Sequence, residues 1–224
     1  MELQPERQHH LTAPISESDI GGLRAGDIVY LSGPVFTARD GVYRHMLVDG
    51  NEPPVDLRGL TNVSFQSSPA GGETALGEYT VSSLQATAGF RYAQYMPELL
   101  GRFGVKMVVG KAGMSEEVYS DVFRRHGAVC LSTMGYGLGA IYGKAVKRVV
   151  DVFWVEELGI SEALWIMELD ELGPLLVEGD AEGASYFAQA NAKINERLDD
   201  LYEGLKPPVY RRLGEEQRPG RELF

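Results

Sequence analysis

The stretch from Val105 to Leu131 has the order of a strand, a glycine-bordered turn, a helix and a second strand. Four of the five residues from Val105 to Val109 are apolar and three are β-branched, which is typical of a buried strand. Ser115, followed by two acids, predicts a helix start, and Gly127 predicts its left-handed end after His126. The apolar residues from Ala128 to Leu131 predict the next strand. This order indicates an open α/β sheet.

Lys111 lies in the turn of this unit, between Gly110 and Gly113. We call residues 110–114 the lysine loop. A cation at the carboxyl end of a strand, beside a helix N-terminus, is placed where open α/β sheets bind anionic ligands. The alternative is a solvated turn lysine. The loop also lacks the longer Gly-x-x-x-x-Gly-Lys-Ser/Thr spacing that wraps a nucleotide phosphate.

Two further places carry cations where predicted strands end. Arg39, beside Asp40, follows the extended residues 35–38, and an arginine fork held by a neighbouring acid suits a carboxylate. Thr87 and Arg91 stand four residues apart near a predicted helix start, where a hydroxyl and a guanidinium can share one anion. A surface Arg–Asp pair and a capping threonine are the structural alternatives.

The charge balance limits the classes of partner. The sequence has 32 acids against 21 Lys and Arg, a formal net charge of −11, which argues against nucleic acid or an anionic membrane. No apolar run approaches the ~20 residues of a membrane span, and the N-terminus lacks a signal-peptide core, which together predict a cytoplasmic protein. Cys130 is the single cysteine and the four histidines lack ligand spacing, so we expect no metal site in this chain.

We expect one domain at residues 15–205, an N-terminal arm at 1–14 and a C-terminal tail at 206–224. The glycine- and proline-rich segment 67–77 predicts a loop, and residues 185–205 predict the clearest amphipathic helix. Residues 42–48 could form a helix or a strand, and short helices are expected from residues 90 and 98. The other predicted strands are residues 27–33, 35–38, 63–66, 78–84, 149–155, 164–169 and 173–177.

A glycine-rich turn at residues 134–140 offers a different function. Gly135, Gly137 and Ala140 match the G-x-G-x-x-G/A pattern of dinucleotide sites, with Glu156 and Glu157 about twenty residues later. Too little chain follows to complete a nucleotide domain. A tight turn for close packing of a helix on a strand explains the glycines equally well.

Several separated segments together resemble one family. Residues 31–40, the Thr87 to Arg91 segment, the lysine loop, residues 157–165 and residues 173–175 resemble, in order, the β subunit of L(+)-tartrate dehydratases and the C-terminal half of class I fumarases. The resemblance covers roughly residues 12 to 190. Both are iron–sulfur hydro-lyases.

The resemblance implies an α/β fold, a three-layer β/β/α swivelling domain with a central, mostly parallel sheet. It implies an α-type partner subunit whose three cysteines carry a [4Fe–4S] cluster, in an assembly built on a homodimer or on two subunits of each type. The substrate would be a small hydroxy-dicarboxylate. By position, Arg39, Arg91 and Lys111 would bind its carboxylates, Thr87 and Lys111 would be catalytic, and Asp40 and Tyr43 would support them.

The sequence departs from the family pattern around these residues. Tyr43 stands where the family has a histidine, Gln85-Ala86 replaces Gly-Pro, Ala88 replaces a second threonine, and Ala112 replaces a glycine. Tyrosine is a weaker proton carrier than histidine at pH 7. The hypotheses are therefore a hydro-lyase β subunit, a non-catalytic dicarboxylate-binding or scaffold subunit of the same family, and a nicotinamide enzyme built on residues 135–140.

Overall fold

The computed structural model describes residues 7–111, 113–135, 137–198 and 203–204. The chain divides into two compact units, residues 1–189 and residues 190–224. The first unit contains the sheet and the helices packed on it.

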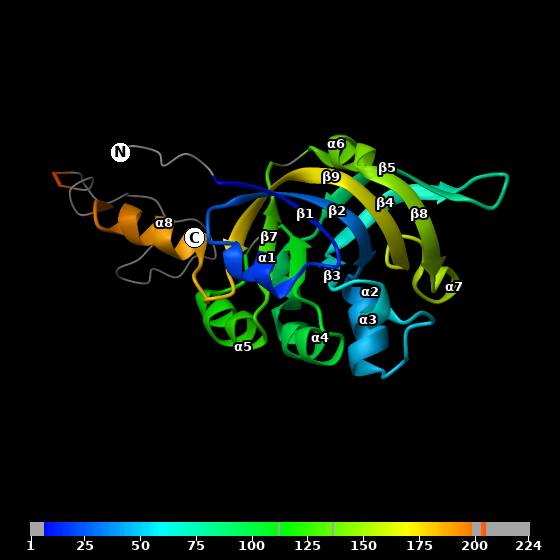
Figure 1. Ribbon diagram of the computed structural model, residues 1–224, viewed down its shortest axis with the longest axis horizontal. Coiled ribbons are helices and arrows are strands. Elements are labelled where there is room, and N and C mark those ends of the chain that lie inside the picture. The colour runs from blue at the N-terminus through cyan, green and yellow to red at the C-terminus, as the bar shows by residue number, and fades with distance from the viewer. Residues whose placement is uncertain (1–6, 112, 136, 199–202, 205–224) are drawn as a thin grey trace. The chain divides into compact units, whose positions relative to one another are not determined.

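A seven-stranded sheet forms the centre of the first unit, with the strand order β1-β2-β3-β6-β7-β9-β8 (Figure 1). The pairs β1–β2, β2–β3, β3–β6 and β6–β7 are parallel, whereas β9 is antiparallel to β2, β7 and β8. Because β9 pairs with both β2 and β7, the strands β2, β3, β6, β7 and β9 form a closed ring. The strands of the sheet are β1 (Gln8–Thr12), β2 (Ile28–Thr37), β3 (Val63–Phe65), β6 (Met107–Gly110), β7 (Val129–Thr133), β8 (Val146–Phe153) and β9 (Leu164–Gly179).

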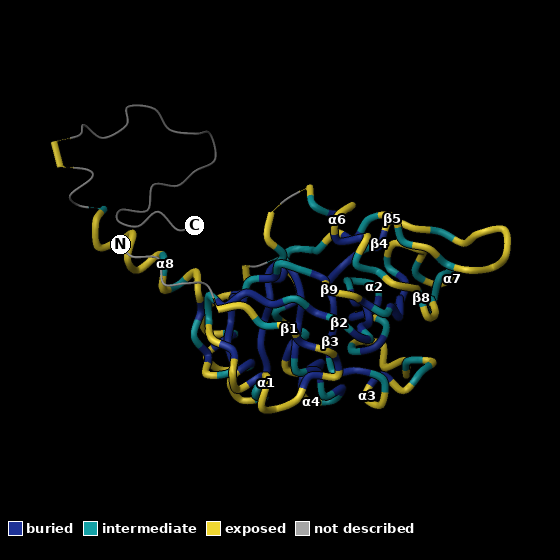
Figure 2. The backbone as a smooth tube through the Cα atoms, turned by 45° about the horizontal axis from the view of Figure 1, so that its top comes forward, coloured by how far each residue is buried: buried dark blue, intermediate teal, exposed yellow. Residues whose placement is uncertain are grey.

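A separate two-stranded hairpin, β4 (Ser67–Glu73) and β5 (Tyr79–Ala86), leaves the sheet after β3 and returns beside β6. Its tip is exposed and extends away from the buried strands (Figure 2).

Short helices connect the strands, and those between β2 and β7 cover one face of the sheet (Figure 1). The α-helices are α1 (Glu17–Gly22), α2 (Asp40–Tyr43), α3 (Leu57–Leu60), α4 (Met96–Arg102), α5 (Arg124–His126), α6 (Gly139–Lys144), α7 (Val155–Leu158) and α8 (Tyr186–Asn195). A 3-10 helix, η2 (Gly89–Tyr95), and two π-helical turns, η1 (Arg44–Val48) and η3 (Val118–Phe123), complete the set.

The side-chain alternation of the strands divides the core into two clusters. In β6, Met107 and Val109 face the interior of the ring, while Val108 faces the helices. In β7, Leu131 faces the interior and Cys130 faces the helices. Each fully buried side chain of this size contributes about 1.5–3 kcal/mol relative to an exposed one. The parallel strands are therefore apolar on both faces, as their sequences predict.

The predicted strand–turn–helix–strand unit is confirmed. Residues 107–110 form β6, residues 129–133 form β7, and the helical segment between them ends at Gly127, whose φ of +54° is left-handed. The segment 42–48, which the pattern left open, is helical.

Three sequence expectations about strands were wrong. The expected loop 67–77 contains β4, because its partner β5 satisfies the backbone groups that its glycines and proline leave without local structure. The expected breaks within 27–38 and 164–177 are absent. β2 is one strand of 10 residues and β9 is one strand of 16 residues, since each is held along its length by the other.

The α/β class is confirmed, and the sheet is mixed because antiparallel β8 and β9 join the parallel strands. The three-layer swivelling architecture stays a prediction, as do the domain boundaries. Residues 8–12 of the expected arm form β1, paired with β2. The expected tail 206–224 and the end of the predicted 185–205 helix lie outside the described residues, and α8 accounts for 186–195. Among the described residues, no helix has the length and apolarity needed to cross a membrane.

Two adjacent glycines of β4 test this hairpin. A Cβ at Gly71 would lie 2.0 Å from the carbonyl oxygen of Thr80, whereas a Cβ at Gly72 would have no atom within 4 Å. We expect Gly71→Ala to lower the free energy of unfolding by about 1–3 kcal/mol. We expect Gly72→Ala to change it by less than about 0.5 kcal/mol. Urea denaturation of both variants measures the difference, and equal midpoints would contradict the hairpin packing.

Candidate active site

The carboxyl ends of three neighbouring parallel strands bring the predicted site residues to one edge of the sheet. β2, β3 and β6 are adjacent, with Thr37 opposite Phe65 and Phe65 opposite Val109. Gln66 and Lys111 follow β3 and β6 directly, and Arg39 is the second residue after β2. The carboxyl ends of parallel strands are where α/β folds bind their ligands, in open sheets and in closed barrels alike.

Three backbone hydrogen bonds join the ends of β3, β5 and β6 into one junction. The Gln66 N–H donates to Val109 O at 2.8 Å, the Thr87 N–H donates to Gln66 O at 2.6 Å, and the Lys111 N–H donates to Thr87 O at 3.1 Å. Thr87 is thereby held beside Lys111 through its own N–H and C=O. Gly110 allows the Gln66 side chain to pack close to the backbone, because a Cβ here would lie 2.6 Å from Gln66 Oε1.

Arg39 is held by Glu162, an acid from the segment before β9. The Arg39 Nη1 lies 2.9 Å from Glu162 Oε1, and the side chains are 20% and 25% exposed. The other carboxylate oxygen of Glu162 accepts from the Gly41 N–H at 2.9 Å. The Arg39 Nε is buried without a hydrogen-bond partner among the described residues. The guanidinium is thus fixed while part of it stays accessible.

Asp40 holds Arg91, and not Arg39 as the sequence suggested. Arg91 Nη2 and Asp40 Oδ2 form an ion pair, and the Tyr92 hydroxyl donates to the same carboxylate oxygen at 3.3 Å. Burial raises the pKa of Tyr92, opposed by a hydrogen bond with Arg39. The acidic neighbour of Arg39 therefore orients the second arginine, and Tyr92 connects the two.

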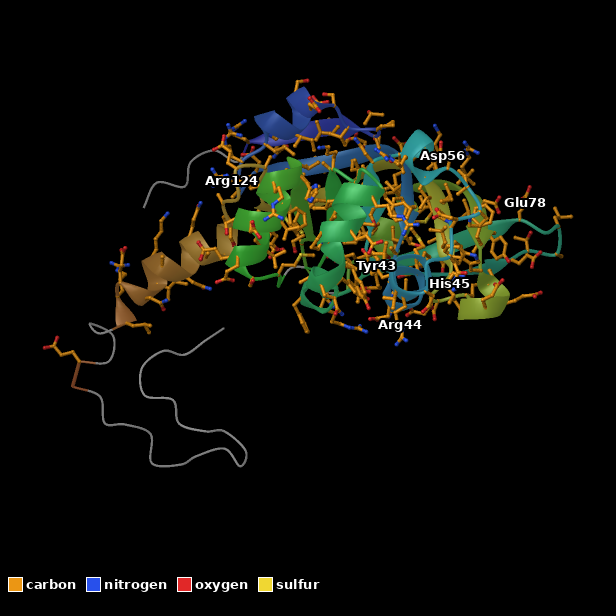
Figure 3. The ribbon with its side chains drawn as sticks, turned by 90° about the horizontal axis from the view of Figure 1, so that it is seen from below. Tyr43, Arg44, His45, Asp56, Glu78 and Arg124 are labelled. Carbon is orange, nitrogen blue, oxygen red and sulfur yellow. The ribbon has the colours of Figure 1, made fainter. Side chains whose placement is uncertain are left out.

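Tyr43 is buried with only 1% of its surface exposed, inside the helical layer (Figure 3). Its hydroxyl lies 3.4 Å from Gln66 Nε2, and its ring stacks on Tyr95 with centroids 5.2 Å apart. Burial raises the pKa of Tyr43 well above its usual value near 10, opposed by hydrogen bonds with Gln66 and Ser64. The hydroxyl stays neutral, and it contacts the junction from the core side.

The lysine loop is fixed at two amides. Lys111 is bonded through its N–H to Thr87, and Gly113, with a left-handed φ of +104°, donates its N–H to Glu178 Oε1 at 3.1 Å. Burial raises the pKa of Glu178, an effect opposed by hydrogen bonds with Tyr119 and the Gly113 N–H. Ala112, the departure within this loop, lies outside the described residues.

The donor set of this chain does not fit a metal or iron–sulfur cluster. Among the described residues, no group of three or more His, Cys, Asp or Glu side chains is placed to hold a metal ion. The single cysteine, Cys130, is buried in β7, and burial raises the pKa of its thiol well above the usual value. A cluster needs several thiolates.

The glycine-rich stretch is explained by packing of α6 on β5. A Cβ at Gly139 would lie 2.1 Å from Gln85 Nε2, and one at Gly143 would lie 2.7 Å from the carbonyl oxygen of Ser82. Gly135 and Gly137 have left-handed φ angles of +89° and +85°. These contacts favour the turn-and-packing explanation over a dinucleotide site.

Sequence reasoning identified the cations and missed the groups that orient them: Gln66, Tyr92, Glu162 and Glu178. Glu162 and Glu178 reach the site through the antiparallel pairings of β9, which no local pattern shows. For Glu162 a signal was present, since it lies within the family-like segment 157–165.

The Arg39–Glu162 pair allows a quantitative test. A double-mutant cycle with Arg39→Ala and Glu162→Ala should give a coupling free energy of about 1–3 kcal/mol, because both groups are largely shielded and their geometry is fixed. The pair Arg125–Asp121, whose side chains are both 64% exposed, is the matched control and should give about 0.5 kcal/mol or less. Similar coupling in both cycles, measured by urea denaturation, would show that Glu162 does not fix Arg39.

Comparison with known proteins places the chain in a family. The family model described as Fumarase C-terminus matches residues 2–190. The chain is 32% identical over 190 residues to "Putative L(+)-tartrate dehydratase subunit beta" of Methanocaldococcus jannaschii, covering 84% of this chain and 95% of the relative. It is 30% identical over 203 residues to the L(+)-tartrate dehydratase subunit beta of Escherichia coli K12, covering 89% and 96%.

A longer relative shows the same relation. The chain is 28% identical over 200 residues to "Putative fumarate hydratase class I" of Geobacillus stearothermophilus, a match that covers 89% of this chain and 37% of the relative. The names of these relatives describe hydro-lyases and, for the shorter ones, a β subunit. The match over residues 2–190 includes Arg39, the junction and the lysine loop, and the chain belongs to the fumarase C-terminus family.

Proposed function

We propose that this chain is the β subunit of a hydro-lyase that adds or removes water on a small hydroxy-dicarboxylate of the fumarate/malate or tartrate type. One observation carries the proposal. Arg39, Lys111 and Thr87 follow strands whose ends meet at one edge, and backbone hydrogen bonds lock the last two together. The names of the tartrate dehydratase and fumarate hydratase relatives support the reaction class.

The reaction has requirements that these residues suit. Loss of water from a 2-hydroxy diacid removes a proton from the carbon beside one carboxylate, so negative charge grows on that carboxylate in the transition state. Fixed cations on both carboxylates stabilise that charge. A proton acceptor and an electrophile for the departing hydroxyl are also needed. This chain provides cations and a hydroxyl.

Each residue has a proposed role. Arg39 and Arg91, each oriented by an acid, bind carboxylate oxygens through their planar forks. Lys111 binds the carboxylate on which charge develops. Thr87 lies in the same junction and takes part in proton transfer. Its backbone is fixed on both sides, which holds the hydroxyl-bearing residue beside the lysine loop.

The electrophile is assigned to a partner. We propose an α-type subunit that holds a [4Fe–4S] cluster through three cysteines, because this chain has one cysteine and it is buried. Bound there, the cluster would supply a Lewis-acidic iron for the substrate hydroxyl. A homodimer, or an assembly of two subunits of each type, is the proposed form of the complex.

Anaerobic co-expression of this chain with such a partner tests the proposal. The loaded complex is expected to hydrate fumarate-like acids or to dehydrate tartrate-like acids, followed by the absorbance of the unsaturated product. A loaded complex that turns over neither class of acid would refute the enzyme assignment for these substrates.

Replacement of Lys111 tests its role in that complex. We expect Lys111→Met to lower kcat/KM by about 10²- to 10³-fold, because a fixed cation at the developing charge is lost. Lys147→Met, on the exposed β8 surface, is the matched control and should leave kcat/KM unchanged within about twofold. Equal activity of the two variants would exclude Lys111 from the site.

Replacement of Tyr43 distinguishes a structural role of its hydroxyl from a role in proton transfer. Because its hydroxyl is buried against Gln66, we expect Tyr43→Phe to keep kcat within about threefold while lowering the free energy of unfolding by about 1 kcal/mol. A loss of kcat beyond about 100-fold with an intact fold would instead identify Tyr43 as a proton carrier.

A non-catalytic dicarboxylate-binding or scaffold subunit is the second candidate. The burial of Tyr43, at the position where the family resemblance has a histidine, favours it. Calorimetry of the assembled complex would then detect dicarboxylate binding that Arg39→Ala abolishes, without turnover of any hydroxy-diacid.

A further inference from the structure

Glu178 is a buried acid that contacts the lysine loop. It precedes Gly179, the last residue of β9, and only 1% of its surface is exposed. Its Oε1 accepts the hydrogen bond from the Gly113 N–H at 3.1 Å. Packing alone does not call for an acid at this depth, because an apolar side chain of similar volume fills a core without being desolvated.

Glu178 interacts with a phenol hydroxyl, a thiol and a backbone amide. Strand alternation directs Val177 into the ring and Glu178 toward the helices, where its charge interacts with Cys130 of β7 and Tyr119 of η3. The Tyr119 ring lies against β9, since a Cβ at Gly179 would come within 2.3 Å of it. Burial raises the pKa of all three groups, because it disfavours the charged form of each.

The carboxyl group of Glu178 has two polar neighbours. Its Oε1 accepts from the Gly113 N–H, and the Tyr119 hydroxyl lies near enough to oppose the rise in the pKa of Glu178 that burial causes. A buried acceptor is costly to leave unpaired. The Gly113 amide is the neighbour through which this buried acid reaches the lysine loop.

The loop is fixed on either side of its lysine. The Lys111 N–H is bonded to Thr87, whose position depends on Gln66. The Gly113 N–H, two residues later, is bonded to Glu178 across β7. Without the second bond, the Lys111 amide alone would hold this part of the chain, and Gly113 could change its backbone conformation.

We propose that Glu178 is a positioning residue that holds the lysine loop through the Gly113 amide and so keeps Lys111 directed beside Thr87. The inference deepens the proposed function and rests on it for the meaning of Lys111 as a carboxylate ligand. Glu178 acts as a hydrogen-bond acceptor, for which the neutral amide of glutamine is a substitute of the same shape.

Hydrogen exchange of the full chain, resolved at single backbone amides by NMR, tests the inference. In the wild type the Gly113 amide should exchange more slowly than an unprotected amide. Glu178→Met should accelerate this exchange by about five- to tenfold, corresponding to one lost hydrogen bond, and Glu178→Gln should stay within about threefold of the wild type. Circular dichroism in the near ultraviolet verifies that each variant is folded.

Three results would overturn the inference. One is a wild-type Gly113 amide that exchanges as if unprotected, which needs no variant. Another is a folded Glu178→Met variant with unchanged Gly113 exchange. The third is a Glu178→Gln variant that exchanges as fast as the Met variant, because the acceptor is retained there.

The assembled complex distinguishes this inference from the proposed function. If both hold, Glu178→Met lowers kcat for the hydroxy-diacid more than it raises KM, because Lys111 acts on charge that develops in the transition state, and Glu178→Gln restores kcat. If the wild-type complex has no activity, the proposed function fails while the exchange results still decide the role of Glu178.

Discussion

The hydrogen bonds among Gln66, Thr87 and Lys111 are the contacts on which the site depends. They connect segments that leave the sheet at three different points in the sequence, at the ends of β3, β5 and β6. The β4–β5 hairpin lies between Gln66 and Thr87 in the sequence, and its two ends lie together at this junction. Because Thr87 uses both its N–H and its C=O in this junction, its backbone cannot move independently of the lysine loop.

β9 provides the second constraint, because it closes the ring and brings an acid to each side of the site. Glu162 lies just before the strand and forms an ion pair with Arg39. Glu178 lies at the end of the strand and accepts a hydrogen bond from Gly113. β9 pairs with both β2 and β7, and these two pairings set the separation of the two acids. Glu162 and Glu178 therefore connect this part of the chain to Arg39 and to the lysine loop.

These two constraints explain what the sequence could predict. The apolar runs of β6 and β7 and the turn residue Gly127 depend on local chemistry, and they were correctly predicted. β4 was missed because its glycines and proline are typical of a loop until a partner strand is present. The pairing of Arg39 with Glu162, 123 positions later by residue number, results from the long-range register of β2 and β9, which has no local signal.

The ion pairs of the two arginines limit how strongly this chain can attract a dicarboxylate. Arg39 and Arg91 each have a carboxylate partner, so a bound dianion would share each guanidinium with an acid already present. Such sharing orients the donors well but reduces the net positive charge available to the ligand. On the proposed function, much of the attraction for a dicarboxylate then comes from groups outside this chain. We therefore expect the chain to orient substrate, while most of the affinity arises on assembly with a partner, as a shared active site requires.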